Sequence, residues 1–214
     1  MIDDFAGPAW AECHEKFAAD LAAGLARLAR WLRRPAKTRD DGGVEAASAK
    51  RQSTSQAVTI APEASVGADA QYCLGEYYRE LQERFDGGFD PELSLLPSLD
   101  EFAPPRGTFL LVRLNSEPVG CGGLKPISSE AAYLKRMWIA PGARGLGLAR
   151  GLLSSLEDEA RAMGYSIVRL ETNKALLEAQ QLYRSAGYAE VAPFNDERYA
   201  HHWFEKRLDQ VPIG

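Results

Sequence analysis

Residues 133–153 read YLKRMWIAPGARGLGLARGLL, a β-like segment joined to an amphipathic helix through a glycine-containing turn. The two glycines of the turn, Gly145 and Gly147, leave the main chain open to close approach by a ligand. Backbone N–H groups at the start of a helix have no internal partner, and the helix dipole favours an anion there. Arg144 adds a forked cationic donor at the same turn. The stretch therefore predicts a pocket for a phosphate or pyrophosphate group.

Three other interpretations of this turn fit to different degrees. A tight turn that binds no ligand is the plain alternative, and the turn alone leaves it open. A Rossmann dinucleotide site normally follows the first strand of a βαβ unit and has an acidic residue about 20 positions later. Here a hairpin comes first, so that site fits poorly. A P-loop is excluded because the turn has no Gly-Lys-Ser/Thr.

Outward from this turn, hydrophobic patterns predict a series of strands and helices. Strands are expected at 57–61, 108–114, 118–124, 131–140, 165–172, 188–194 and 201–208. Helices are expected at 67–85, 144–163 and 174–186. Segment 86–106 is rich in Gly and Pro, which is typical of a long loop or a broken helix, and such loops are often functional. The order predicts an α/β fold with a mixed sheet and helices on its faces.

The N-terminal part of the chain differs from the rest. Residues 1–34 carry apolar side chains at helical spacing and predict an amphipathic helix, and the polar residues 35–56 predict a flexible linker before a domain at 57–214. The helix packs on the main domain or on a second copy, which would make a homodimer, or it recruits another protein. Acidic side chains on its polar face argue against a membrane surface.

Composition excludes several classes of protein. The 214 residues carry a formal net charge of -5, so no global basic field attracts nucleic acid. The cysteines, Cys13, Cys73 and Cys121, form no CxxC pair and no spacing typical of a metal site. No secretory signal is recognisable, and no apolar run approaches the ~18 residues of a membrane span. A cytoplasmic protein is expected.

Two blocks of the sequence resemble one family. Residues 133–153 resemble the acetyl-CoA-binding signature of the GNAT superfamily of N-acetyltransferases, a strand followed by Arg/Gln-x-x-Gly-x-Gly/Ala, which Arg144, Gly147 and Ala149 fill. Downstream, LETNKALLEAQQLYRSAGY (170–188) is similar to the second half of the same core. The matching positions there are Asn173, Tyr183 and the pair Gly187-Tyr188. In element order the resemblance covers about residues 57–208, and it implies a GNAT-like acyl-CoA N-acyltransferase fold.

The resemblance implies that acetyl-CoA is the cosubstrate and that an amine attacks its thioester directly in a ternary complex. The pyrophosphate would lie beside Arg144 on the main chain of five residues, Gly145, Leu146, Gly147, Leu148 and Ala149. The backbone of Ile139 would pair with the pantetheine, the N–H of Met137 would hold the acetyl oxygen, and Asn173 would bond the pantetheine amide. The plain alternatives are strand core for Met137 and Ile139 and a helix cap for Asn173.

By the same resemblance, Tyr183 is the general acid that protonates the leaving thiolate, the alternative being a core aromatic on its helix face. The general base is open, because some relatives carry a glutamate where this chain has Tyr133. Glu171 suits a base that acts through water, although it could instead order its loop or pair with Arg169 or Lys174. The candidates for the base are Glu130, Glu171, His201 and His202.

The acceptor is expected between segment 86–106, the helix before it and the last hairpin. That border carries acidic and aromatic side chains, namely Asp86, Asp90, Glu92, Asp100, Glu101, Tyr77, Tyr78, Phe89 and Phe102. Such groups suit a cationic amine through charge and cation–π contact, although the acids could equally form a solvated surface. A small amine, an amino acid, an aminoglycoside, a polyamine and a protein amine all remain open.

The prediction is an enzyme, a cytoplasmic N-acetyltransferase that moves an acetyl group from acetyl-CoA to a primary amine, most simply of a small molecule. It needs no metal, nucleic acid or membrane. One alternative is transfer to a lysine or N-terminus of a protein. The other is a non-catalytic acetyl-CoA-binding regulatory module, which the absent strand glutamate favours and the retained Tyr183 disfavours.

Overall fold

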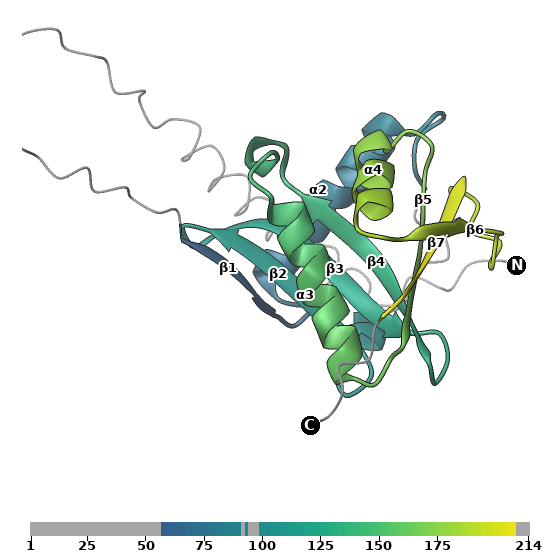
Figure 1. The fold of residues 1–214 in the computed structure, drawn as a ribbon. Coiled ribbons are helices and arrows are strands. Elements are labelled where there is room, and N and C mark those ends of the chain that lie inside the picture. The colour runs from purple at the N-terminus through teal and green to yellow at the C-terminus, as the bar shows by residue number, and fades with distance from the viewer. Residues whose placement is uncertain (1–56, 91–92, 94–98, 209–214) are drawn as a thin grey trace, which may run out of the picture. The chain divides into compact units, whose positions relative to one another are not determined.

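Seven strands form one mixed sheet in the order β1-β2-β3-β4-β5-β7-β6 (Figure 1). The computed structural model describes residues 57–90, 93 and 99–208. The helix predicted for 1–34 and the linker predicted for 35–56 lie outside the described residues. All strand pairs are antiparallel except β4 with β5. The strands are β1 (Val58–Pro62), β2 (Thr108–Leu114), β3 (Glu117–Pro126), β4 (Ala131–Ile139), β5 (Ile167–Thr172), β6 (Ala189–Val191) and β7 (His202–Arg207).

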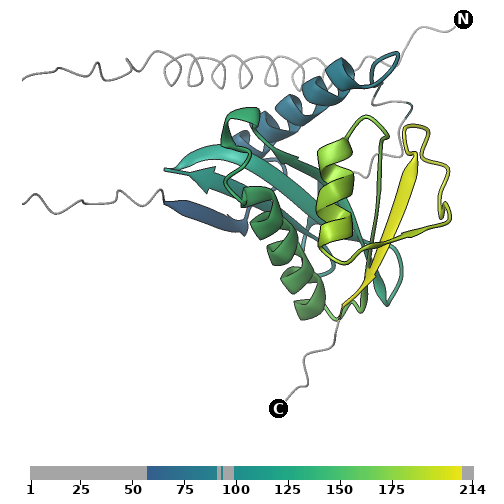
Figure 2. The same ribbon diagram turned by 45° about the horizontal axis from the view of Figure 1, so that its top comes forward.

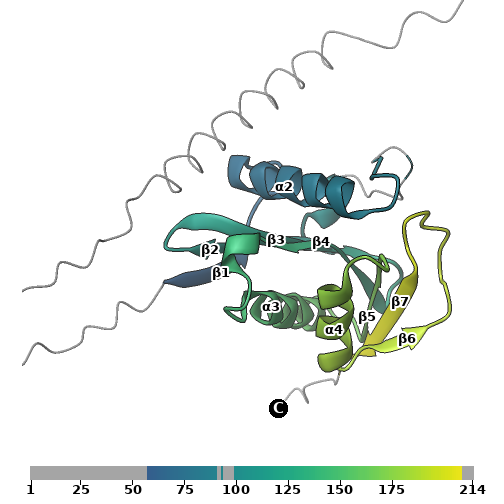
Figure 3. The same ribbon diagram turned by 90° about the horizontal axis from the view of Figure 1, so that it is seen from above.

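The described α-helices cover both faces of the sheet. Helix α2 (Ala68–Arg84) lies on one face, and α3 (Leu148–Ala162) and α4 (Leu177–Ser185) lie on the other (Figures 2 and 3). Two short 3-10 helices, η2 (Leu99–Phe102) and η3 (Pro141–Ala143), complete the elements. The mixed α/β sheet with helices on its faces is therefore confirmed.

Three predicted elements are much shorter than expected. Helix α3 begins at Leu148 rather than at 144, because Gly147 has φ 78° and cannot belong to a right-handed helix. Helix α4 begins only at Leu177, since the preceding residues form a turn around Asn173. The strand expected at 188–194 is reduced to the three residues of β6.

The hairpin β2–β3 is confirmed, and its turn explains its register. Leu114 pairs with Glu117, which leaves a two-residue loop of Asn115 and Ser116. Both loop residues have positive φ, 52° and 70°. Two such residues make the turn whose twist matches the two strands, and asparagine tolerates that conformation better than most residues.

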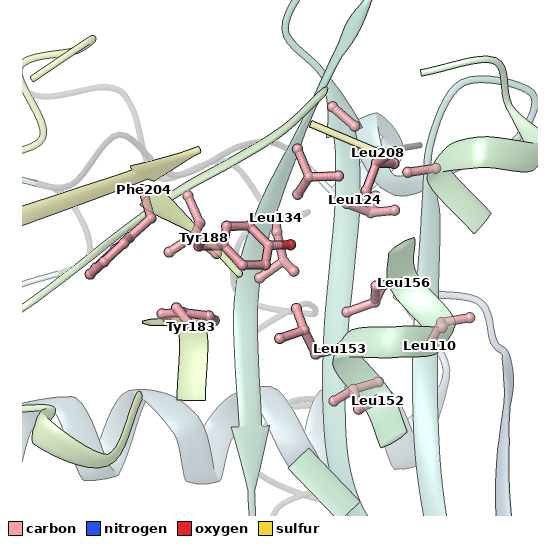
Figure 4. Close-up of a cluster of buried hydrophobic side chains, with 14 of the residues drawn as sticks. Leu110, Leu124, Leu134, Leu152, Leu153, Leu156, Tyr183, Tyr188, Phe204 and Leu208 are labelled. Carbon is pink, nitrogen blue, oxygen red and sulfur yellow. The ribbon is translucent and has the colours of Figure 1, made fainter. Parts of the chain in front are cut away.

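The main core lies between the sheet and helix α3 (Figure 4). Leu152, Leu153 and Leu156, which the helical spacing placed on one face, are all buried there against strand residues such as Leu110 and Leu124. A second core cluster lies under α2 and includes Cys73 and Cys121 as free, buried thiols. The two clusters pack on opposite faces of the sheet and so fix the positions of the strand ends that form the site. Within the described part of the chain, no helix is long and apolar enough to cross a bilayer.

Candidate active site

Strands β4 and β5 separate along their length and leave a slot between them. Their pairing is limited to residues 131–133 of β4 and 167–169 of β5. Beyond these pairs, β4 continues to Ile139 and β5 continues to Thr172, but the two strands no longer pair with each other. Figure 1 shows them diverging. A cavity of about 90 Å³ lies here, lined by residues of α2, β4, β5, α4 and the segment before β7. In this slot, the backbone N–H and C=O groups on the β5 side of β4 have no strand partner among the described residues and can bind a ligand.

A β-bulge changes the course of β4 beside the slot. Against β3, the register moves from Gly123 opposite Lys135 to Cys121 opposite Trp138, so Arg136 and Met137 have no place in the ladder. Arg136 has φ 58°, an uncommon value for a residue with a side chain. Bulges of this kind are frequent next to active sites, because they turn a side chain or an amide away from the sheet. Met137, predicted to supply an oxyanion donor, therefore lies at the bulge and lines the cavity.

The glycine turn before α3 has the conformation that an anion site needs. Gly145 and Gly147 have φ 79° and 78°, and a Cβ at either position would meet no atom within 4 Å, so the surrounding space is open. The amide of Arg144 bonds to the carbonyl of Pro141 (3.3 Å), and the next amide with a main-chain acceptor is that of Gly151, on Gly147 (3.0 Å). Among the described residues, no carbonyl accepts from the amides of 145–150, which remain available as donors.

The side chain of Arg144 is fixed by hydrogen bonds within the protein. Its Nε donates to the carbonyl oxygen of Ile139 (3.0 Å), and its Nη2 donates to Oε2 of Glu80 on α2 (2.5 Å). Trp138 Nε1 donates to the same carboxylate oxygen (2.8 Å). The arginine thus joins the end of β4, where the pantetheine contact was predicted, to α2 and to the start of the turn.

This arginine belongs to a chain of ion pairs between α2 and α4. Arg84 bonds to Glu80 (2.9 Å) and to Glu178, and it also donates to the carbonyl of Ala175 (2.7 Å). The hydrogen bond from Arg84 holds the pKa of Glu178 at about 2, although burial opposes the shift. Burial would raise the pKa of Glu80, but hydrogen bonds from Arg144, Arg84 and the Trp138 indole outweigh it and lower the pKa.

The lowered pKa of Glu178 predicts a pH dependence of stability. Its ordinary value in an unfolded chain is about 4.3, above the folded value, so its contribution is present above pH 4.3 and is lost as the pH falls toward 2. We expect the thermal midpoint to fall less steeply between pH 5 and 2 in Glu178→Gln than in the native protein. The difference should be small, because the Glu178 side chain is 54% exposed. Glu130→Gln, at an exposed position, is the control, and identical curves for Glu178→Gln and the native protein would contradict the assignment.

Tyr183 lies at the inner end of the cavity. It is buried on α4, its ring contacts Tyr188 and Phe204, and its hydroxyl points to the sulfur of Met137 (3.9 Å). Burial first, and then the charge of Glu171, raises the pKa of Tyr183 above its ordinary value, so the phenol keeps its proton at neutral pH. The residue is thus both a core aromatic and a protonated hydroxyl in the slot.

Asn173 is occupied by local hydrogen bonds. Its side-chain oxygen accepts from the amide of Ala175 (2.9 Å), and its side-chain nitrogen donates to the carbonyl of Tyr199 (2.7 Å). Its own carbonyl accepts from Gln180 (3.2 Å). These bonds make it the residue that turns β5 into α4 and fastens the segment before β7. A pantetheine contact stays a prediction.

A buried charged cluster surrounds the end of β5. Glu171 accepts from the Tyr133 hydroxyl and bonds to Lys135, whose Nζ is also 3.7 Å from Glu197. The side chains of Lys135, Glu171 and Glu197 are only 10%, 6% and 4% exposed. Asn195 donates to the Tyr133 hydroxyl (2.5 Å). Tyr133 therefore occupies the strand position of the missing glutamate and directs its hydroxyl at Glu171. Burial, and then the Glu171 charge, raises the pKa of Tyr133.

Sequence reasoning did not identify Lys135 and Glu197. Lys135 could have been found, because it lies two residues after Tyr133 and so shares a strand face with it. Glu197 lies in the segment between β6 and β7, where no periodicity marks it. The alternative that Glu171 pairs with Arg169 or Lys174 does not hold, because Arg169 bonds to Glu205 (2.8 Å) and Lys174 to Asp86 (3.1 Å).

Of the four candidate bases, Glu171 alone lines the cavity. Glu130 is exposed just before β4, next to the strand end where β4 and β5 are still paired. His202 contacts Glu190 on β6 (2.6 Å), and His201 lines a neighbouring, outer cavity. The structure therefore brings only one predicted carboxylate to Met137 and Tyr183.

The expected acceptor groups separate in the structure. Tyr77 and Phe89 line the inner cavity, and Asp86 and Asp90 line the outer cavity of about 600 Å³. Glu101 instead bonds to Lys125 (2.7 Å). Tyr78 stacks on Phe89 and Phe102 is buried in the cluster under α2, while Glu92 and the side chain of Asp100 lie outside the described part of the chain.

Comparisons with known proteins agree with this geometry. Residues 74–188 match the model of the acetyltransferase (GNAT) family. The chain is 37% identical over 139 residues to an IAA acetyltransferase of Azospirillum brasilense, covering 64% of this chain and 88% of that protein. An acetyltransferase of the GNAT family from Staphylococcus aureus has the same fold, with a TM-score of 0.60 at 20% identity over 71% of this chain and 99% of the other. The PaiA N-acetyltransferase of Thermoplasma acidophilum, solved in complex with coenzyme A, gives 0.55 at 16% identity over 71% and 99%.

Proposed function

The chain belongs to the GNAT acetyltransferase family, and from that premise we propose that it transfers the acetyl group of acetyl-CoA to a primary amine. The observation that carries the proposal is the slot between β4 and β5, which holds Met137, Tyr183 and Glu171 in one cavity. The family accounts for an acyltransferase, and the primary amine and the residue roles are our inference.

The residues present fit acetyl-CoA. Amides 145–150 have no main-chain acceptor in the described chain, and the two glycines leave open space in front of them, which suits a pyrophosphate. Ile139 ends β4 where the strand has left β5, which supports a pantetheine contact along this stretch of backbone, although the Ile139 carbonyl already accepts from Arg144. When bound, acetyl-CoA would supply an activated thioester. The coenzyme A complex of the Thermoplasma protein, which shares the fold, supports this cosubstrate.

Three groups of the chain would carry the chemistry. Glu171 takes a proton from the acceptor ammonium, directly or through a water, so that the amine can attack. The N–H of Met137, which lies at the bulge of β4, stabilises the negative charge that develops on the acetyl oxygen. The Tyr183 hydroxyl gives its proton to the leaving sulfur. Its raised pKa is consistent with this, because an acid must be protonated before it acts.

The two alternatives differ from this proposal in what they predict. A non-catalytic module would bind acetyl-CoA and release no thiol with any amine. A protein acetyltransferase would prefer a peptide amine over every small amine. Glu171 and Tyr183 in one cavity favour catalysis over simple binding, because together they offer a proton acceptor and a proton donor, which binding alone does not need.

The deciding experiment measures thiol release from acetyl-CoA with a panel of small amines and amine-bearing peptides. Amine-dependent release, with an acetylated product identified by mass, supports the proposal. Tight binding of acetyl-CoA with no release over any amine would instead establish the regulatory module.

Arg144→Ala should weaken coenzyme A binding by roughly 1–3 kcal/mol, the range for a charge-assisted hydrogen bond. The loss follows whether Arg144 contacts the phosphates or only fixes the turn through Ile139 and Glu80. Calorimetric titration measures it. Arg113→Ala is the control, because that arginine forms its ion pairs with Glu63 and Asp69 instead. Unchanged affinity in Arg144→Ala would remove Arg144 from the cofactor site.

A further inference from the structure

Aromatic rings form the wall between the two cavities. Phe85, Phe89 and Tyr199 line both the inner cavity of about 90 Å³ and the outer one of about 600 Å³. Their ring centroids are 4.8 Å (Phe89 to Tyr199), 5.8 Å (Phe85 to Tyr199) and 5.8 Å (Phe85 to Phe89) apart. Tyr77 adds a further ring to the inner lining. A molecule that reaches the slot from the outer cavity therefore meets this ring wall, here defined as Phe85, Phe89 and Tyr199.

Hydrogen bonds hold the ring wall in place. The amide of Phe89 donates to Oε1 of Gln82 (2.8 Å), and the amide of Asp90 donates to the Tyr199 hydroxyl (2.9 Å). The rings are thus fixed before a ligand arrives, which lowers the entropic cost of binding a flat apolar group. Contacts between aromatic rings also stabilise a complex by more than the apolar area that they bury would.

The inner cavity is lined by carboxylates that can accept a hydrogen bond from an ammonium group. Lys135 lies between two buried carboxylates, Glu171 and Glu197, so this cluster carries two negative charges and one positive charge. The other cation of the described lining, Arg136, holds its guanidinium over the rings of Phe102 (5.1 Å) and Tyr78. The described lining thus has no further lysine or arginine for a carboxylate next to the amine, which disfavours an amino acid.

The outer cavity gives a second ammonium little advantage. Its described lining includes two carboxylates, Asp86 and Asp90, and two cations, Lys174 and Arg198, and Asp86 forms an ion pair with Lys174 (3.1 Å). A polyamine would place its second charge here among groups of both signs. The surface next to the slot is instead aromatic, which suits an uncharged flat group.

We propose that the acceptor is an arylalkylamine, a primary amine on a short aliphatic stem that ends in an aromatic ring. Its ammonium group lies at the Lys135, Glu171 and Glu197 cluster, and its ring lies on the ring wall. This inference rests on the proposed acetyl transfer and names its substrate class.

The test compares kcat/KM of the full chain for 2-phenylethylamine, n-butylamine, putrescine, phenylalanine and an amine-bearing peptide. We expect 2-phenylethylamine to exceed each of the others by about tenfold or more, the size of effect that one aromatic contact supports. A preference for putrescine, phenylalanine or the peptide would overturn the arylalkylamine class while leaving acetyl transfer established. Turnover of none of the amines would overturn both proposals.

Variants at Tyr199 make the test independent of how much protein is active. The readout is the ratio of kcat/KM for 2-phenylethylamine to that for n-butylamine, in which the active fraction cancels. Tyr199→Ala removes a ring of the wall and should lower this ratio by about fivefold or more. Tyr199→Phe keeps the ring, loses only the acceptor for the Asp90 amide, and should keep the ratio. An equal ratio in Tyr199→Ala and the native protein would show that the ring wall does not bind the substrate.

Discussion

Tyr183→Phe should lower kcat by about 100-fold to 10,000-fold, the usual contribution of a positioned general acid. The substitution removes one hydroxyl and keeps the ring that packs on Tyr188 and Phe204. The KM for acetyl-CoA should change little, because the loss falls on proton transfer to the leaving sulfur and not on cofactor binding. Steady-state kinetics with a saturating amine measure both constants.

Tyr188→Phe is the matched control for that variant. Tyr188 is also a buried tyrosine of the same core cluster, but it does not line the cavity. A fall in kcat confined to Tyr183→Phe would place the hydroxyl in the reaction. Native turnover in Tyr183→Phe would leave the residue with a packing role alone and would require another proton donor.

Glu171→Gln should lower kcat/KM for the amine by about 100-fold or more at neutral pH. The amide keeps the size of the side chain and can still accept from the Tyr133 hydroxyl, but it cannot take the proton of an ammonium. The acceptor must then lose its proton to bulk water before it binds. We therefore expect the remaining activity to rise with pH toward the pKa of the free amine.

Glu157→Gln is the control for Glu171. Glu157 is another buried glutamate, bonded to Lys206 of β7 (2.7 Å), and it does not line the cavity. Both variants break a buried ion pair, so both should lose stability. Only Glu171→Gln should change the pH profile of the activity that remains. If the two profiles coincide, Glu171 is a structural member of its cluster, and the proton acceptor is another group.

In the proposed mechanism, Glu171 takes the place of the glutamate that some relatives carry at position 133. Tyr133 and Lys135 lie on one face of β4 and both bond to Glu171 across the gap to β5. The proposed base therefore comes from β5, and its contacts with Tyr133 and Lys135 fix the position of its carboxylate. Asn195, bonded to the Tyr133 hydroxyl and to Trp203 Nε1, extends this support to β7.

Much of the fold was predictable, because its signals lie within short stretches of chain. The hairpin depended on two strands and a polar tip, and the structure confirms it with Asn115 and Ser116 in the turn. The Leu152, Leu153 and Leu156 face of α3 followed from helical spacing and is buried. Element ends were less predictable: the start of α3 at Leu148 depends on the left-handed φ of Gly147, and apolar spacing does not report it.

The sequence by itself determined the family, the order of the elements and the glycine-containing turn after Arg144, because each depends on neighbouring residues and their backbone preferences. Only the tertiary structure decided which carboxylate faces Tyr183, that Glu197 and Lys135 join it, and that Phe85, Phe89 and Tyr199 form one wall. These groups come from distant segments, and they meet because the β4 bulge and the short β4–β5 pairing open a slot at one place. Strand register and splay arise from packing across the whole sheet, so no local pattern encodes them.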